Sequence, residues 1–593
     1  RAVRRPLRAA APSCILAPST DKEHALSDKP DPEHVPLRPS LAEEPADVVY
    51  RGRELSVPRG TTVAELMRLA PHDDDERVLA ALVNNRVVSL DAALLRSGTV
   101  EPVFVSSRHG ARIFRRHLTM MLYQVFYAAF PGARIRVGQA ISEGYYFEVD
   151  DVEVSDALCE RLSRDLEALV GERRPFHYRR VPVEEARRLF ARKGSDVKRR
   201  ILDCWPSSHV GLVSLDGFTD FCLGPVAPHT GLFDRFKLTT LGRDLVLQFP
   251  DTGAPGVHRI TGPQPKLYAT HKESRKWSEL LGVSHVGELN DACIEGSIRE
   301  VIKVAEGLHE KRISDIADEV VMDRGRKLVF IAGPSSAGKT TFAKRLSIQL
   351  RVAGIRPRSI SLDDYYVDRE RTPLDADGRY DFEALEAIDL SLFNDHLNRI
   401  LAGERVETPV YDFQQGRRAP ADRWASVQLA DDQVLVIEGI HGLNPSLTPE
   451  VRADAQYRVY VNALNPLAVD EHNRLHTSDV RLIRRIVRDR HYRGYSAAET
   501  IGNWDSVRRG EREHIFPCQE SADVIFDTSL IYEFSVLKIF AERYLVEVPR
   551  SDRAYAEAYR LRKFLGMFVP VLPGDVPQAS LMREFIGGSS FSY

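Results

Sequence analysis

Residues 327–346 read KLVFIAGPSSAGKTTFAKRL, and this stretch decides the fold of the C-terminal half of the chain. Its first apolar run, residues 328–332, is typical of a strand buried in a parallel sheet. The loop that follows fits G-x-x-x-x-G-K-[ST] at every fixed position, from Gly333 to Thr340. Phe342, Leu346 and Leu350 then recur at helical spacing. Strand, loop and helix together predict a phosphate-binding loop in the context that the motif requires.

The residue types in this loop indicate a nucleotide ligand. Gly333 and Gly338 let the backbone turn so that successive N–H groups face one concavity, and the helix N-terminus that follows favours anions. Lys339 adds a positive charge for the β- and γ-phosphates, and the Thr340 hydroxyl is a ligand for Mg²⁺. We therefore expect ATP and Mg²⁺ as cofactors. The residues expected to contact the nucleotide are Gly333, Pro334, Ser335, Ser336, Ala337, Gly338, Lys339, Thr340 and Thr341.

The length, composition and charge of the chain limit the classes of protein to which it can belong. At 593 residues the chain is too long for one core, so several domains are expected. A formal net charge of -3 argues against broad nucleic-acid binding through overall charge, but not against a local basic patch. The six scattered cysteines form no C-x-x-C pair, and no apolar run is long enough for a bilayer. These features favour a reduced, cytoplasmic protein without membrane contact.

Residues 1–45 differ from the rest of the chain. Several arginines precede the first acid, Asp21, and proline, alanine and serine are common. The pattern is compatible with an organelle-targeting segment, but it favours a disordered tail.

Beyond residue 326, short apolar runs alternate with helical patterns. This alternation predicts a doubly wound, mostly parallel α/β sheet. Ligands in such folds bind outside the carboxyl ends of the strands. The strands are expected at residues 328–332, 359–362, 434–437, 457–461 and 524–526.

Three segments with acidic side chains follow the phosphate-binding loop, each at the end of a predicted strand. They read SLDDYY at 361–366, PVYDF at 409–413 and VLVIEGI at 434–440. Together with the loop and in this order, they resemble the uridine kinase/phosphoribulokinase family over residues 327–527.

This resemblance implies roles for individual residues. Asp363 is the expected general base, with a further contact to Mg²⁺ through water, and the adjacent Asp364 is the fallback. Glu438 is expected to hold Mg²⁺ or its waters together with Thr340. Residues 481–494, RLIRRIVRDRHYRG, match the family's lid. The lid arginines expected to stabilise the charge of the transferred phosphate are Arg485, Arg488 and Arg493.

The acceptor side chains implied by the resemblance are Tyr366, Asp381, Tyr411 and Arg418. Asp381 is expected to bind sugar hydroxyls and the tyrosines to pack against the sugar or base, although aromatic residues at these positions also suit an ordinary core. The histidine with which the family reads the base falls at Gly416. This departure removes the best argument for a pyrimidine nucleoside.

The front half of the chain resembles another enzyme class. Residues 46–106 have strand patterns at 48–50, 55–57, 78–83 and 87–88, and a short helix that Thr61 or Thr62 caps. This module resembles a TGS domain, a β-grasp module of threonyl-tRNA synthetases. Residues 107–290 resemble the α+β editing domain of the same enzymes, through PGARIRVGQAISEGYYFEVD at 131–150 and FTDFCLGPVAPHTGLFDRFKL at 218–238.

The metal ligands of that editing domain are mostly replaced. Its H-x-x-x-H falls at Arg116 and Met120, with His117 out of register, and its C-x-x-x-H falls at Cys222 and Val226. A metal site needs several converging ligands. We therefore expect a structural cysteine and no bound zinc.

The remaining segments complete the expected order of domains. Residues 291–325 are predicted to form a connecting helix, with amphipathic spacing over 294–318. The nucleotide-binding domain is expected over 326–530, and a helical extension over 531–593. The order of the parts resembles larger relatives in which such a kinase is fused to TGS and editing-like domains.

These patterns favour an ATP- and Mg²⁺-dependent kinase that phosphorylates a hydroxyl of a small acceptor, with a nucleoside as the first expectation. The alternative is a nucleotide-gated RNA- or ribosome-binding regulator that uses the TGS and editing-like domains. A weaker option is another acceptor, such as a sugar phosphate or a pantothenate-like alcohol. Asp363, Glu438 and the lid arginines favour the kinase, since a switch needs no acceptor base. A homo-oligomer is also expected.

Overall fold

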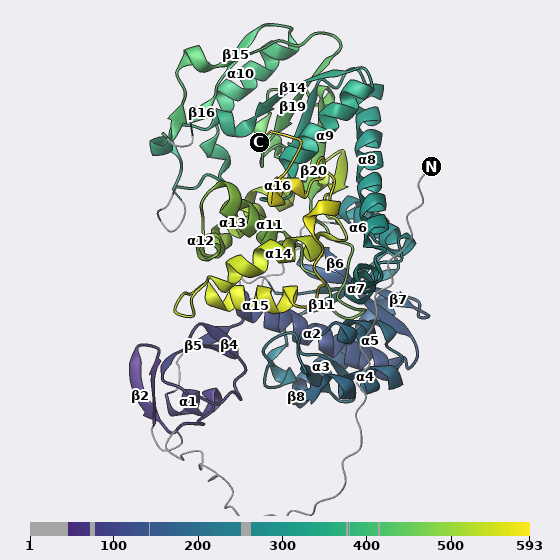
Figure 1. The fold of residues 1–593 in the computed structure, drawn as a ribbon, viewed down its shortest axis with the longest axis vertical. Coiled ribbons are helices and arrows are strands. Elements are labelled where there is room, and N and C mark those ends of the chain that lie inside the picture. The colour runs from purple at the N-terminus through teal and green to yellow at the C-terminus, as the bar shows by residue number, and fades with distance from the viewer. Residues whose placement is uncertain are drawn as a thin grey trace, which may run out of the picture.

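The computed structural model describes residues 45–70, 77–141, 143–250, 263–374, 378, 380–412 and 415–592 (Figure 1). Nearly all of the predicted N-terminal tail, residues 1–44, and Phe413 of the PVYDF segment lie outside these ranges. No helix within the described ranges is both long and apolar enough to cross a membrane.

The module predicted at 46–106 is a five-stranded mixed sheet with one helix. Its strand order is β2-β1-β5-β3-β4, with β1 and β5 parallel. Thr62 caps the helix and exchanges hydrogen bonds with Glu65, a capping box that fixes where the helix begins. The elements are β1 (Ala46–Tyr50), β2 (Arg53–Val57), α1 (Val63–Leu69), β3 (Val78–Val83), β4 (Arg86–Val88) and β5 (Gly98–Phe104).

The region predicted to resemble an editing domain combines two antiparallel sheets with several helices. The sheets have the orders β10-β9-β8 and β11-β12-β7-β6. The long helix α2 packs its buried face between them, in one core with α3. The elements are α2 (Arg108–Ala129), β6 (Arg134–Ile141), β7 (Gly144–Asp150), α3 (Asp156–Glu172), β8 (His177–Pro182), α4 (Val183–Arg192), α5 (Asp196–Asp203), β9 (His209–Leu215), β10 (Phe218–Phe221), β11 (Lys237–Leu241), β12 (Asp244–Gln248), α6 (Pro265–Leu280) and α7 (Val286–Glu295).

The connection at 291–325 is not one helix from residue 294. Helix α7 ends at Glu295, where Gly296 adopts a left-handed φ of 85°, and α8 (Ile298–Met322) begins two residues later. Glycine closes helices in this conformation because it has no Cβ to clash. Helix α8 then runs along the C-terminal half and packs against α9 (Lys339–Val352) (Figure 1).

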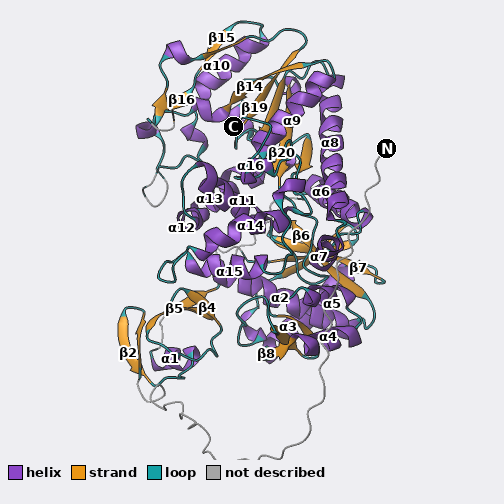
Figure 2. Cartoon of the chain, viewed as in Figure 1, coloured by secondary structure: helices purple, strands orange, loops and turns teal. Residues whose placement is uncertain are grey.

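The C-terminal half contains the predicted doubly wound sheet. Its five strands are all parallel, in the order β14-β19-β13-β20-β21, and the helices lie on its two faces (Figure 2). The strands are β13 (Leu328–Ala332), β14 (Arg356–Ser361), β19 (Gln433–Glu438), β20 (Gln456–Asn462) and β21 (Val524–Asp527). The remaining elements are α10 (Leu390–Leu401), β15 (Val406–Thr408), β16 (Tyr411–Asp412), β17 (Arg417–Arg418), β18 (Ala425–Val427), α11 (Thr477–Tyr492), α12 (Ala497–Gly502) and α13 (Trp504–Gly510).

The C-terminal extension is part of the main core rather than a separate appendage. Its apolar side chains join a buried cluster that also includes side chains of α4, α5, α7, α8 and α11. The extension therefore ties the editing-like region to the nucleotide-binding half. Its helices are α14 (Glu533–Val546), α15 (Tyr555–Leu565) and the short α16 (Arg583–Ile586).

A buried charge cluster also joins the two halves. Lys198 on α5 lies 2.5 Å from a carboxylate oxygen of Asp220 on β10 and 2.6 Å from one of Asp470, which follows β20. All three side chains are almost fully excluded from solvent. Each charge in this cluster therefore depends on a partner from another part of the chain.

Candidate functional site

The phosphate-binding loop leaves β13 and enters α9 as the motif predicts. A Cβ on Gly333 would collide with the carbonyl oxygen of Val461 on β20, so the close backbone approach requires glycine here. Gly338 and Ser336 have positive φ angles of 87° and 57°. Glycine adopts this left-handed conformation without strain. Helix α9 then begins at Lys339, with its N-terminus at the loop.

The lysine and the threonine of the motif have different partners. The Lys339 ammonium donates to the carbonyl oxygens of Gly333 and Pro334, at 3.0 and 3.3 Å. The Thr340 hydroxyl donates to the carboxylate of Glu438 at 2.6 Å, where β19 ends beside β13. Burial raises the pKa of Glu438, and Lys339 opposes this shift. A hydroxyl and a carboxylate side by side are the oxygen ligands that Mg²⁺ takes in nucleotide sites, so these residues fit that ion.

The two adjacent aspartates after β14 have separate roles. Asp364 accepts a hydrogen bond from the backbone N–H of Tyr411 at 3.1 Å. Asp363 lies near Lys339 and accepts a hydrogen bond from Tyr366. Burial raises the pKa of Asp363, while Lys339 and Tyr366 oppose the shift. Asp363 is thus the carboxyl group beside the loop lysine, and Asp364 supports the backbone of the neighbouring hairpin.

The three predicted lid arginines differ in their contacts. Arg485 on α11 donates to the Ser335 hydroxyl at 2.7 Å. Arg488 pairs with Asp489 at 3.0 Å. Arg493 follows the last residue of α11, is half exposed, and lies 3.6 Å from Asp489. Within the described ranges, Arg485 is the one of the three that contacts the loop.

Two further arginines of the same run hold the loop, and sequence reasoning missed them. Arg481 donates to the backbone carbonyl of Ser335 at 3.2 Å and pairs with Glu511 at 2.9 Å. Arg484 pairs with Glu533 at 2.7 Å, and both ion pairs are buried. Positions 481, 484, 485 and 488 share one helix face by spacing, and this signal could have identified them.

Glu383 is a further carboxyl group of the site, and no motif indicated it. Burial raises its pKa to about 7, and Glu511 adds to the shift while Arg485 and Lys339 oppose it. A Cβ on Gly510 would stand 2.6 Å from the Cβ of Glu383, so α13 packs tightly against this side chain. The site therefore contains a carboxyl group that is half ionised near neutral pH, among the charges predicted to act on phosphate.

Three of the predicted acceptor residues are Tyr411, Asp381 and Tyr366, and Tyr366 contacts Asp363. Tyr366 and Tyr411 are buried, with ring centroids 5.8 Å apart in an edge-to-face arrangement. Asp381 is half-buried and accepts a hydrogen bond from the backbone N–H of Glu383 at 3.0 Å. The structure thus places Tyr366 and Tyr411 together beside the base candidate, and Asp381 against the backbone of Glu383.

Arg418, the fourth predicted acceptor residue, forms hydrogen bonds with the backbone beside Tyr366. It donates to the carbonyl oxygens of Tyr365 and Tyr366, both at 3.1 Å, and pairs with Asp389 at 3.1 Å. Nearby, the guanidinium of Arg369 lies 2.7 Å from the place where a Cβ on Gly416 would stand. An arginine therefore lies against the position at which the resembled family reads its base with histidine.

The C-terminal segment reaches the phosphate-binding loop. The side chain of Leu581 lies 2.7 Å from the place where a Cβ on Gly338 would stand. Glu584 on α16 accepts hydrogen bonds from the Thr341 hydroxyl at 2.6 Å and from its backbone N–H at 3.4 Å. Glu511 accepts from another backbone N–H of the loop, at 3.1 Å. Two carboxylates of the protein thus occupy donors of the kind that bind phosphate oxygens.

The remnant of the editing-like site does not fit zinc. Both ring nitrogens of His117 contact backbone, the carbonyl of Ile113 at 2.8 Å and the N–H of Ala227 at 3.1 Å. Burial lowers its pKa to about 3, so the ring is neutral. The Cys222 thiol donates to the carbonyl oxygen of Gly224 at 3.0 Å, and burial raises its pKa. The expected ligand positions are held by Arg116, Met120 and Val226.

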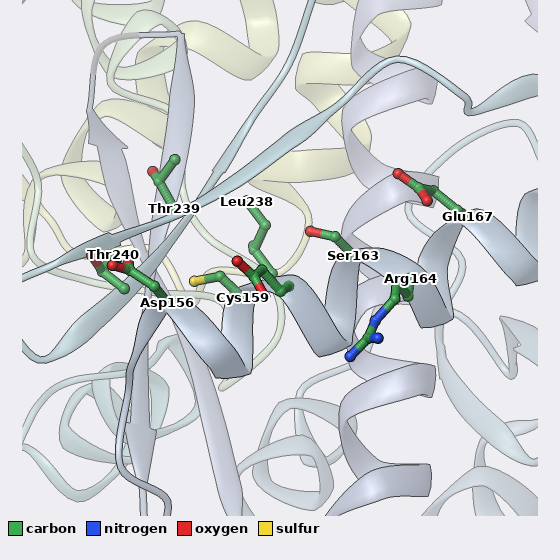
Figure 3. A pocket seen from close by; sticks show the side chains of 9 residues that line it. Asp156, Cys159, Ser163, Arg164, Glu167, Leu238, Thr239 and Thr240 are labelled. Atoms are coloured by element: carbon green, nitrogen blue, oxygen red, sulfur yellow. Dashed lines mark hydrogen bonds between the residues drawn. The ribbon is translucent and has the colours of Figure 1, made fainter.

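A separate hollow of about 470 Å³ lies between α3 and β11. Figure 3 shows Cys159, Ser163 and Glu167 along one side of α3, with Thr239 and Thr240 opposite. Burial raises the pKa of the Cys159 thiol to about 11, which leaves it protonated at neutral pH. A thiol is a poor nucleophile in that state. This hollow therefore lacks an activated cysteine, and none of its lining residues belongs to the phosphate-binding loop.

Comparisons with known proteins divide the chain in the same way. Residues 328–530 match the phosphoribulokinase/uridine kinase family. The chain is 30% identical over 186 residues to a threonine–tRNA ligase from Symbiobacterium thermophilum, covering 31% of this chain and 29% of the relative. It is 27% identical over 232 residues to that of Rubrobacter xylanophilus, covering 39% and 35%. The chain thus spans about a third of the length of these relatives.

Two solved structures are similar over part of the chain. One is described as a possible uridine kinase from Bacillus stearothermophilus, with a TM-score of 0.25, 20% identity, and coverage of 37% of this chain and 98% of that one. The other is D-glycerate 3-kinase from Cryptococcus neoformans, with a TM-score of 0.20, 15% identity, and coverage of 46% and 88%. Neither overall similarity supports an inference about function.

The motifs, the parallel sheet and the family match agree, so the recognition of both halves from sequence is confirmed. Residues 328–530 match the phosphoribulokinase/uridine kinase family, and the chain joins them to an N-terminal region similar to threonine–tRNA ligases.

Proposed function

We propose that this protein is an ATP- and Mg²⁺-dependent kinase that transfers the γ-phosphate to a hydroxyl group of a small acceptor, with a nucleoside as the first expectation. The observation that carries the proposal is the position of Asp363. Its carboxyl group lies near Lys339, within reach of Tyr366, at the carboxyl end of the parallel sheet. A site that only senses nucleotide has no need of such a base.

The surrounding side chains support the roles that phosphoryl transfer requires. Such enzymes act mainly by positioning the reactants and by stabilising charge. Lys339 and Arg485 supply positive charge at the loop, since Arg485 donates to Ser335 within it. When bound, Mg²⁺ neutralises charge on the phosphates, and Thr340 and Glu438 are the residues that would hold it.

Asp363 suits the role of general base for two reasons. Burial raises its pKa, which strengthens a carboxylate as a base. Lys339 opposes this shift, because its positive charge favours the ionised carboxylate. In this proposal Asp363 accepts the proton from the acceptor hydroxyl as the oxygen attacks phosphorus, while Tyr366 and Asp381 position the acceptor.

The acceptor is best identified by turnover. ATP consumption by the full chain is measured against nucleosides, sugar phosphates and small alcohols, with Lys339→Ala as the blank. Stimulation by one acceptor well above the blank supports the kinase and names its substrate. Nucleotide binding without stimulation by any acceptor would overturn the kinase in favour of the regulator, and binding to tRNA or ribosomes would then be tested.

The position of Arg369 makes the sugar phosphates an informative part of this panel. Its guanidinium lies against Gly416 in the acceptor region, and its backbone N–H donates to the Gly416 carbonyl at 2.8 Å. Guanidinium groups recognise phosphate well. Preference for a phosphorylated acceptor, lost in Arg369→Ala, would place the protein on the sugar-phosphate side of its family.

A further inference from the structure

A large cavity in the front half belongs to no part of the proposed kinase site. It holds about 1140 Å³ between α2, the β8–β10 sheet, the β4 end of the N-terminal module and α15. Small-molecule sites typically measure about 300–1,000 Å³. No residue of the phosphate-binding loop lines it. The cavity is therefore large enough for a ligand of its own.

Arg116 is the central cation of this cavity. Its guanidinium donates to the carbonyl oxygen of Pro225, and no carboxylate within the described ranges pairs with it. The missing Cβ of Gly224 makes room for it, since a Cβ there would stand 2.5 Å from Arg116 Nη1. Burial lowers the pKa of Arg116, so the charged form lacks compensation. A bound anion would provide it.

Arg474 adds a second cation that pairs with no carboxylate in the described part of the chain. It donates to Gln139 Oε1 at 2.6 Å, and its guanidinium carbon lies 4.5 Å from the centre of the Tyr145 ring. Its Nε is buried and has no hydrogen-bond partner among the residues that the structure describes. A buried donor without a partner is costly, so it marks a place where a ligand acceptor would be stabilised.

The carboxylates that line the cavity do not balance these cations. Four carboxylates line it, and three of them are already paired: Asp220 with Lys198 at 2.5 Å, Asp479 with Arg560 at 2.8 Å, and Glu542 with Lys538 at 3.5 Å. The fourth is Asp91. Further lining cations without a carboxylate partner within the described ranges are Arg86, Arg180, Arg562 and Lys563. The cavity therefore has an excess of positive charge.

Aromatic side chains supply flat surfaces in the same space. Tyr178 is 49% exposed and lines the cavity beside Gly211. Tyr559 on α15 lies between Arg86 at 4.8 Å and Lys563 at 5.2 Å. An exposed aromatic face beside a guanidinium suits a ligand with both a planar ring and a phosphate, because stacking and charge act together.

We propose that this cavity is a second nucleotide site, which binds a mononucleotide with its phosphate on Arg116 and its base against Tyr178. The site is separate from the phosphate-binding loop, so the proposal does not rest on the kinase activity. The volume suits one nucleotide.

Binding is tested on the full chain with Lys339→Ala, which weakens the loop site. Isothermal titration with AMP and UMP is expected to show one remaining site, and adenosine or inorganic phosphate alone to bind much more weakly. Adding Arg116→Ala should weaken the mononucleotide about tenfold or more, the loss expected for a hydrogen bond to a charged group. Arg192→Ala, an exposed arginine on α4 that does not line the cavity, should change nothing.

Two further variants separate binding from folding. Arg116→Lys keeps the charge but loses the planar fork, and Gly224→Ala displaces Arg116 without removing it. Both should weaken the mononucleotide while the melting temperature stays within a few degrees of the parent. The proposal is overturned if neither AMP nor UMP binds in the Lys339→Ala background, if folded Arg116 variants bind them as the parent does, or if only an RNA oligonucleotide binds.

Discussion

The nucleotide-binding half and the editing-like half keep their folds but differ in their chemistry. In the first, Thr340 meets Glu438 at 2.6 Å and Asp363 lies near Lys339, so the motif residues act on one another. In the second, both ring nitrogens of His117 form hydrogen bonds with backbone groups, and the Cys222 thiol donates to a carbonyl oxygen. A fold can therefore persist while its site is replaced, and function has to be argued from the site.

Burial acts on the two halves with different consequences. It raises the pKa of Glu383 to about 7, among cations that keep the carboxyl group titratable near neutral pH. It lowers the pKa of His117 to about 3, which leaves that ring neutral in the physiological range. The first environment suits proton transfer and phosphate binding, whereas the second suits a structural side chain.

Replacing the loop lysine is expected to have the largest effect on activity. Lys339→Ala should reduce phosphoryl transfer by about a thousandfold or more, because charge stabilisation at the phosphates is a large part of such catalysis. Acceptor-stimulated ATP consumption is the measurement. Lys311→Ala, an exposed lysine on α8, is the matched control and should keep full activity. Equal rates in the two variants would show that the loop does no chemistry.

The two adjacent aspartates of the nucleotide-binding half are expected to affect different kinetic constants. Asp363→Asn should keep nucleotide binding but lower the turnover number about a hundredfold to ten-thousandfold, as loss of a general base does. Asp364→Asn should chiefly raise KM for the acceptor, since Asp364 supports the Tyr411 backbone. Steady-state kinetics with fluorescent-nucleotide titration distinguish the two. Full turnover in Asp363→Asn would show that the base assignment is wrong.

Removing the carboxylate that the C-terminal segment places at the loop should improve nucleotide binding. Glu584→Gln keeps the shape of the side chain but removes a negative charge next to Thr341, where phosphate oxygens are expected. A gain of about tenfold in affinity is expected, equal to about 1.4 kcal/mol. Fluorescent-nucleotide titration measures it, with Glu300→Gln on α8 as the control. Weaker binding in Glu584→Gln would mean that the carboxylate helps to build the site.

The raised pKa of Glu383 predicts a dependence of stability on pH. The folded state holds this proton more tightly than the unfolded chain, whose glutamate has its ordinary pKa of 4.5. The carboxyl group therefore stabilises the fold least above about pH 7, and stability falls as pH rises between the two values. Glu383→Gln should raise the melting temperature by a few degrees at about pH 8 and by less at about pH 5. A gain independent of pH would contradict this origin.

The smallest effect is expected from metal removal in the front half. Because His117 and Cys222 already have backbone partners, we predict that the purified chain carries much less than one zinc ion, and that chelation leaves its melting temperature unchanged. Elemental analysis and thermal unfolding with and without EDTA are the measurements. One zinc per chain would show that the site is retained in another form.

Local sequence patterns were sufficient to predict elements whose position depends on the residues of one segment alone. The strand at 328–332 and that at 78–83 lie where their apolar runs predict, and Thr62 caps α1 as expected. The predicted helix over 294–318 was wrong at its start, since amphipathic spacing continues across Gly296 while the backbone does not. The spacing of apolar residues indicates which side chains are buried, but it does not indicate where a glycine in the left-handed conformation ends a helix.

The site was less predictable where it depends on distant parts of the chain. The sequence alone does not show which of two adjacent aspartates is the base candidate, because a shift of one residue along the chain decides which side chain faces the loop. Glu511 and Glu584 reach the loop from segments far beyond the motif, and only the packed core determines this. Arg481 and Arg484 share a helix face with the predicted lid arginines, which spacing shows, but their buried partners Glu511 and Glu533 come from segments that the spacing does not identify.

The buried cluster of Lys198, Asp220 and Asp470 bears on how this fusion can be inherited and studied. Separating the two halves would leave Asp470 in one piece and Lys198 in the other, each in a surface built to exclude water. Lys198 would keep Asp220 in its own half, whereas Asp470 would lose its lysine. The two halves are therefore joined by a charge contact as well as by a shared apolar core, and a cut between them removes both kinds of contact.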